Sequence, residues 1–140
     1  YNDIPGITPK PMDPVKVLQR AYQDELLDAL RAEGAAQGVP YPHVRALLLE
    51  VARRERAHAE ALAEALRRRG APLPPTPKPE EGGWETLLRL LSEEGLDRAY
   101  YLESTFPDPE LEALFTRLGQ EERLNQEAVR KAVMLIGGGL

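Results

Sequence analysis

The chain contains no cysteine, which excludes disulfides, thiolate zinc sites, iron–sulfur clusters and cysteine nucleophiles. Imidazole is almost as scarce, because only His43 and His58 can supply it. No apolar run approaches the ~20 residues that would cross a bilayer. The net charge of −5 argues against a surface built to hold nucleic acid or anionic lipid. We therefore expect no nucleic-acid partner and no membrane partner. The missing cysteines leave the compartment open, and a cytoplasmic location is our expectation.

The 140 residues, 42% of them hydrophobic, are enough for one domain with its own core. The 13 prolines gather in a few places, and the intervals between them predict helices. Asp-Pro pairs at 13–14 and 108–109 are helix-start signals. Alternating β-branched stretches are absent, so the predicted class is all-α. The four predicted helices cover 14–36, 43–69, 84–105 and 110 to the glycines at 137–139, and residues 1–12 are predicted to form an extended arm.

The connector at 70–83 decides the predicted topology. It holds five prolines and three glycines, which favours a stiff, extended chain. Fourteen residues span ~43 Å at ~3.1 Å each, which matches a helix of ~28 residues at ~1.5 Å each. The connector is therefore long enough to cross the whole bundle. We expect residues 13–140 to form one four-helix bundle of the ferritin-like type, with two helical hairpins joined by this crossover.

The chain resembles two copies of one hairpin. The second and fourth predicted helices each carry an apolar seam that is interrupted once by a polar pair three residues apart. The paired positions of the two copies are Glu55 with Glu122, His58 with Asn125, Glu25 with Glu94, and Asp28 with Asp97. Glu93 and Glu121 would replace Glu94 and Glu122 if the helical phase were shifted by one residue.

The glutamates of each copy are predicted to lie at one height. Residue 40, midway between Glu25 and Glu55, lies in the first turn, and residue 108, midway between Glu94 and Glu122, lies in the second. Four carboxylates and His58 would then meet inside the bundle. Burying so many carboxylates without a counter-charge costs several kcal/mol each, which a pair of metal ions would remove.

This pattern resembles the ferritin-like superfamily, and within it the rubrerythrin-like di-iron carboxylate bundles. The resemblance covers about residues 13–136. It implies that Glu25 is a terminal carboxylate, Glu55 a bridging carboxylate and His58 its imidazole partner. Glu94 and Glu122 are the implied counterparts in the second hairpin. The metal positions carried over are Glu25, Glu55, His58, Glu94, Glu122, Asn125 and Asp97.

Asn125 departs from the family, which has its second histidine at this position. An amide oxygen is a much weaker ligand than imidazole, or it could instead hydrogen-bond a carboxylate. A single-ion site, an asymmetric pair of ions and a lost site all remain open. Asp97 could compensate as an extra carboxylate of the third helix. Its counterpart Asp28, however, fits a surface residue equally well.

The resemblance implies a metal-binding protein, with iron, manganese or zinc as one or two ions, whose reduced iron reacts with dioxygen or peroxide. Such a di-metal oxidase or peroxidase would need an external electron donor, because the chain has no cysteine for an iron–thiolate domain. We also expect a homodimer. The alternatives are a hydroxylase, and a degenerate ferritin-like bundle that acts without catalysis as a binding or assembly module.

Overall fold

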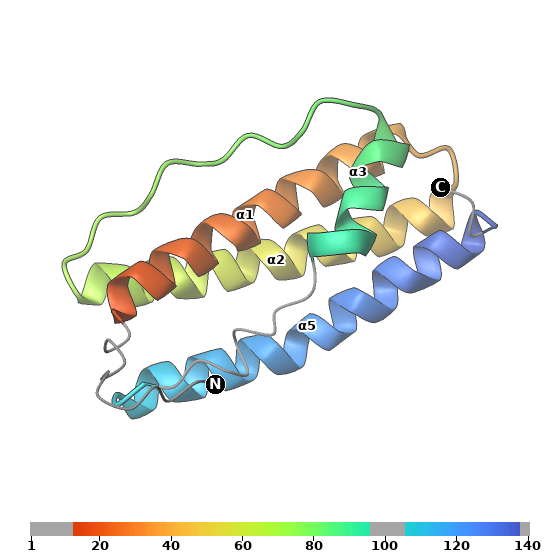
Figure 1. Ribbon diagram of the computed structural model, residues 1–140. Coiled ribbons are helices and arrows are strands. Elements are labelled where there is room, and N and C mark those ends of the chain that lie inside the picture. The colour runs from red at the N-terminus through yellow and green to blue at the C-terminus, as the bar shows by residue number, and fades with distance from the viewer. Residues whose placement is uncertain (1–12, 96–105, 138–140) are drawn as a thin grey trace, which may run out of the picture.

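The computed structural model describes residues 13–95 and 106–137 (Figure 1). These residues form α1 (Pro14–Gly38), α2 (Pro42–Arg68), α3 (Trp84–Leu90), the π-helix η1 (Leu91–Gly95) and α5 (Pro109–Leu135). No strand occurs within these two ranges, so the predicted all-α bundle is confirmed. The predicted arm at 1–12 and the second half of the predicted third helix lie outside the described residues.

The helix boundaries follow the predicted signals. The carboxylate of Asp13 accepts a hydrogen bond from the Val15 backbone N–H at 3.0 Å, and that of Asp108 accepts one from Glu110 at 2.9 Å. α2 ends at Arg68, one residue earlier than predicted. Gly70, just beyond this end, has a φ of +65°, in the left-handed region that glycine adopts without strain.

The third helix differs from its prediction. An α-helix was expected to run without interruption from residue 84, but the backbone changes to π-helical geometry after Leu90. Gly95 at the end of this turn has a weak α-helical preference, which lowers the cost of leaving α geometry. The π-helical turn packs against α1 and α5.

α1 and α2 form an antiparallel hairpin, and α5 lies beside α2 (Figure 1). α3 begins against the α1–α2 turn, where the rings of Tyr41 and Trp84 meet edge to face with centroids 6.4 Å apart. Gly34 lets α3 approach α1 closely, because a Cβ atom at this position would lie 2.6 Å from the Leu87 side chain. These contacts fix α3 to the hairpin end at which α2 starts.

The connector lies along α1 (Figure 1). Gln19 donates to the Pro72 carbonyl at 3.0 Å, and Gln23 donates to the Pro75 carbonyl at 3.2 Å. Further along, Arg31 Nε donates to Glu80 at 2.9 Å. Successive contacts therefore pair later connector residues with later residues of α1. The connector runs parallel to α1, from the end of α2 to the start of α3.

Two separate apolar clusters make up the core of the described residues. One lies toward the α1–α2 turn and includes Val44, Leu88 and Val129. The other lies toward the opposite end and includes Leu18, Leu62, Phe115 and their neighbours. Between them lie buried polar side chains, at the points where the apolar seams of α2 and α5 are interrupted. The fold thus places a polar layer halfway along the bundle.

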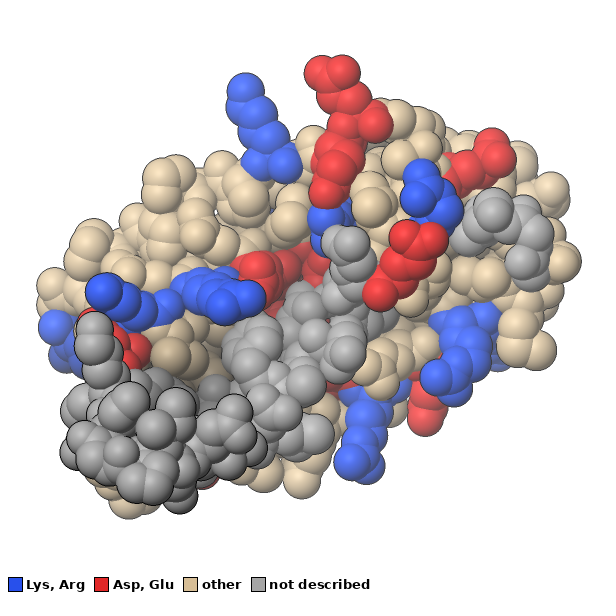
Figure 2. All heavy atoms as spheres, in the orientation of Figure 1, with Lys and Arg blue, Asp and Glu red and all other residues tan. Residues whose placement is uncertain are grey.

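Charged side chains of both signs lie on the outer surface (Figure 2). Over the face shown in Figure 2, basic and acidic side chains are interspersed without a broad area of one sign. Among the described helices, none combines the length and the apolar character that a bilayer span requires.

Candidate metal centre

Four buried side chains from three helices meet in the polar layer. They are Glu25 of α1, Glu55 and His58 of α2, and Glu122 of α5. Each offers one ligand atom, and these atoms all lie within 4.8 Å of one another. The four residues are at most 2% exposed. The equal heights deduced from the sequence therefore bring together the carboxylates of α1, α2 and α5 and the imidazole.

His58 lies at the centre of this cluster. Its Nδ1 atom is 3.1 Å from Glu25 Oε2, 3.2 Å from Glu122 Oε1 and 3.6 Å from Glu55 Oε1. Its Nε2 atom points the other way and lies 2.8 Å from Oε1 of Glu121. Both ring nitrogens thus face carboxylate oxygens, which is the environment of an imidazolium with two N–H donors.

The pKa values follow from this geometry. Burial raises the pKa of Glu55 well above its usual value, and the charges of Glu25 and Glu122 raise it further. Burial alone would lower the pKa of His58, but hydrogen bonds to Glu122 and Glu25, the charge of Glu25 and a bond to Glu121 raise it to about 10. The cluster therefore holds protons strongly, on groups that could instead hold a cation.

The donor set fits a metal ion. Carboxylate oxygen and imidazole nitrogen are ligands for iron, zinc and manganese. Ligand atoms lie about 2.0–2.2 Å from such an ion. The ligand atoms of the four residues all lie within 4.8 Å of one another, so the cluster is compact enough for all four to hold one ion.

Asn125 lies beside the cluster and is fully buried. Its Nδ2 atom donates a short hydrogen bond to Glu55 Oε1. Its Oδ1 atom accepts a hydrogen bond from Arg54 Nη1 at 2.6 Å. The hydrogen bond to a carboxylate that the sequence allowed for this amide is therefore present.

The other predicted site residues are either outside the described part of the structure or outside the cluster. Glu94 is part of η1, but its side chain lies outside the described part of the structure, as does the whole of Asp97. In α5, Glu122 is in the cluster, and Glu121 contacts the outer nitrogen of His58. Glu93 is exposed and lies 3.8 Å from Arg89.

Asp28 is buried, so the interpretation of this position as a surface residue is wrong. It is 1% exposed and accepts a hydrogen bond from Arg31 Nη1 at 3.2 Å. Arg31 also binds Glu80 of the connector through two nitrogens. The i,i+3 spacing of Asp28 and Arg31 was the available signal, but the distant partner Glu80 could not be found from spacing.

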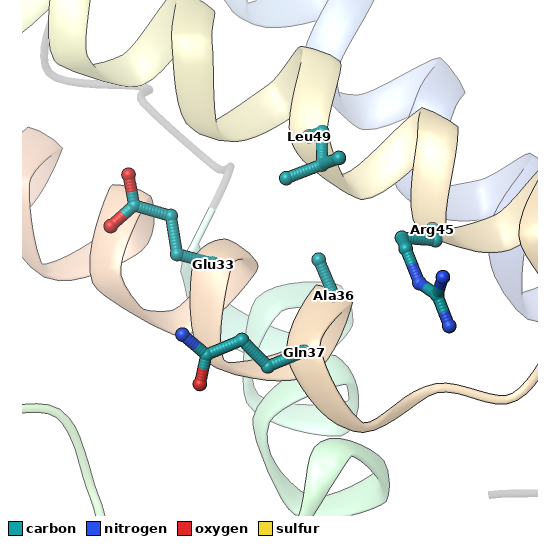
Figure 3. A pocket seen from close by; sticks show the side chains of 5 residues that line it. All are labelled: Glu33, Ala36, Gln37, Arg45 and Leu49. Carbon is teal, nitrogen blue, oxygen red and sulfur yellow. The ribbon is translucent and has the colours of Figure 1, made fainter.

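A surface pocket between α1 and α2 is separate from this centre (Figure 3). It is lined by Glu33, Ala36, Gln37, Arg45 and Leu49. Glu33 is eight residues from Glu25 along α1, a rise of about 12 Å. None of the four cluster residues lines this pocket.

Comparison with protein families gives a match. The family model described as Rubrerythrin matches residues 16–133, which is most of the chain and includes all four residues of the cluster. No match was found among curated proteins or among solved structures.

Proposed function

Because the chain belongs to the rubrerythrin family, a ferritin-like family of di-iron carboxylate proteins, we propose that its buried cluster binds iron and supports the reaction of reduced iron with dioxygen or peroxide. The observation that carries the proposal is the meeting of Glu25, Glu55, His58 and Glu122 within 4.8 Å in the interior. Three carboxylates and an imidazole form a donor set that suits divalent iron, manganese or zinc.

The chain's own groups have distinct parts in this function. Glu25, Glu55 and Glu122 would neutralise the cation, and Nδ1 of His58 would be the nitrogen ligand. Glu121 accepts a hydrogen bond from the opposite ring nitrogen, which holds the imidazole in the orientation a ligand needs. The two apolar clusters on either side limit access of water. Bound ferrous iron would supply electrons to the oxidant, and a separate protein or small molecule would have to restore them.

The proposal is tested by purifying the protein without chelator and measuring iron, manganese and zinc per chain. We expect a near-stoichiometric content, dominated by iron when iron is supplied. Protein loaded with ferrous iron under anaerobic conditions should then oxidise the iron on addition of dioxygen or peroxide. The rate of iron oxidation should be higher with the wild-type protein than with the His58→Ala variant. Absence of bound metal under every condition would refute the proposal.

A second candidate function is a bundle without catalysis that acts in binding or assembly. One observation favours it: Nδ1 of His58 lies within 3.6 Å of three carboxylates, so a protonated imidazole can balance part of their charge. The metal analysis separates the two functions. Under the second, the protein should be monodisperse and folded while it takes up no iron, manganese or zinc.

A further inference from the structure

α2 and α5 exchange contacts in a symmetric way. In each helix, the residue just before the cluster glutamate contacts a residue of the other helix. That contacted residue lies three positions after the cluster glutamate of its own helix. Thus Glu121, before Glu122, lies 2.8 Å from Nε2 of His58. Correspondingly, Arg54, before Glu55, donates to Asn125 Oδ1 at 2.6 Å. The duplicated pattern is kept in position but reversed in charge.

The His58 half of the exchange favours a cation. Its acidic partner Glu121 accepts from the outer ring nitrogen, which leaves Nδ1 facing Glu25, Glu55 and Glu122. Once deprotonated, Nδ1 presents a lone pair to the same point as the three carboxylates. This half therefore has the ligand, its orientation and its counter-charges.

The Asn125 half disfavours a cation. The oxygen of Asn125 is engaged by a guanidinium, and its NH₂ group points N–H donors at Glu55. A metal ligand must present a lone pair, and the amide oxygen, which has the lone pairs, lies on the side of the guanidinium, whereas the amide nitrogen faces Glu55. The Arg54 guanidinium places a fixed positive charge beside this amide. Coulomb repulsion between it and a second ion would be strong at partly buried positions.

The charges of the two outer partners agree with this division. The Asn125 side already holds the positive charge of Arg54, whereas the His58 side holds the carboxylate of Glu121. We propose that the centre binds a single divalent ion on the His58 side, and that Arg54 and Asn125 take the place of a second ion on the other side. This inference rests on the proposed function, because it concerns how many ions the same cluster holds.

The number of ions is measured with Mn²⁺ as the probe, added in excess to metal-free protein and followed by gel filtration and elemental analysis. We expect one Mn²⁺ per chain and an electron paramagnetic resonance spectrum without exchange coupling between ions. Two Mn²⁺ per chain with a coupled spectrum would overturn the inference but leave the proposed function intact. No bound Mn²⁺, iron or zinc would overturn both.

Substitutions test whether Arg54 and Asn125 are the cause. Asn125→Ala should still bind one Mn²⁺, because the amide is not a ligand; loss of the ion, while circular dichroism shows a folded helical protein, would overturn the assignment. The double variant Arg54→Gln/Asn125→His should bind two Mn²⁺, because the α5 half then offers an imidazole without a competing charge. A stoichiometry that stays at one in a folded double variant would also count against the inference. Arg53→Gln, at the exposed neighbouring position, is the matched control and should bind one.

Discussion

Glu25 Oε2 lies 3.1 Å from Nδ1 of His58, although the two residues are 33 positions apart and belong to different helices. The contact exists because α1 and α2 are antiparallel and their polar positions are equally distant from the turn. Two further carboxylates approach the same nitrogen, so His58 is the residue on which the geometry of the centre depends.

The first prediction concerns the ligands on α2. Glu55→Ala and His58→Ala should each reduce bound iron or manganese to background, because either change removes a ligand from a set of four. Elemental analysis of the purified variants measures this. Glu50→Ala alters an exposed glutamate of the same helix and should keep the wild-type metal content. Metal that persists in the Glu55→Ala/His58→Ala double variant would show that the ligand set is wrong.

The second prediction is that protein stripped of metal loses stability as the pH rises. The folded-state pKa of His58 is about 10 against 6.5 for the free side chain, so its contribution is complete below about pH 6.5 and disappears between there and pH 10. The pKa of Glu55 is also raised, and its contribution is lost in the same direction. We expect a Tm lower by roughly 5 °C or more at pH 9.5 than at pH 6.

Thermal unfolding followed by circular dichroism, in chelator-treated buffers of equal ionic strength, measures this dependence. His58→Gln is the comparison, because it keeps a polar side chain of similar size without the titrating ring, and its Tm should vary less with pH over this range. A wild-type Tm that is flat or rises between pH 6 and 9.5 would contradict the raised pKa values.

The third prediction is that metal binding releases protons. Nδ1 of His58 must lose its proton before it can coordinate, and Glu55 must ionise to neutralise the ion. At pH 7 we expect release of at least one proton per ion, and an affinity that increases with pH. Calorimetric titration with Mn²⁺ in two buffers of different ionisation enthalpy gives the number of protons. Equal observed enthalpies in the two buffers would mean that no proton is exchanged.

Much of the bundle could be predicted from the sequence because its signals are local. The Asp-Pro pairs mark helix starts through a carboxylate that caps its own helix, and the structure has both caps. The apolar seams of α2 and α5 repeat at helical spacing, and seam residues such as Leu48, Leu62, Leu111 and Leu118 are buried. Their polar interruptions at Glu55 and Glu122 predicted where the apolar core divides.

Contacts between different helices were harder to predict. The Arg54–Asn125 hydrogen bond depends on how α2 and α5 are rotated against each other, and no spacing within one helix encodes that rotation. The ion pair of Arg31 with Glu80 joins residues 49 positions apart and depends on the path of the connector. No periodic pattern in the sequence marks the π-helical turn at Leu91–Gly95. Its single glycine weakens the α-helix but does not indicate which other geometry the backbone adopts.

The last prediction concerns this anchoring of the connector. Glu80 binds Arg31, whose side chain is only 7% exposed, and the hydrogen bond from Arg31 lowers the pKa of Glu80. Glu80→Ala should lower the free energy of unfolding by about 1 kcal/mol, because Arg31 keeps Asp28 as a partner but loses a bidentate one. Glu81→Ala, at the exposed next position, should change it by less than about 0.5 kcal/mol. Urea unfolding at pH 7 measures both.

The pH dependence of this difference identifies its cause. Because the folded-state pKa of Glu80 is below the usual 4.5, the carboxylate contributes stability above about pH 4.5 and loses it as the pH falls through its folded-state value. The gap between Glu80→Ala and Glu81→Ala should therefore narrow when urea unfolding is repeated at pH 3. A gap of the same size at both pH values would mean that the loss comes from the connector backbone and not from the charged contact with Arg31.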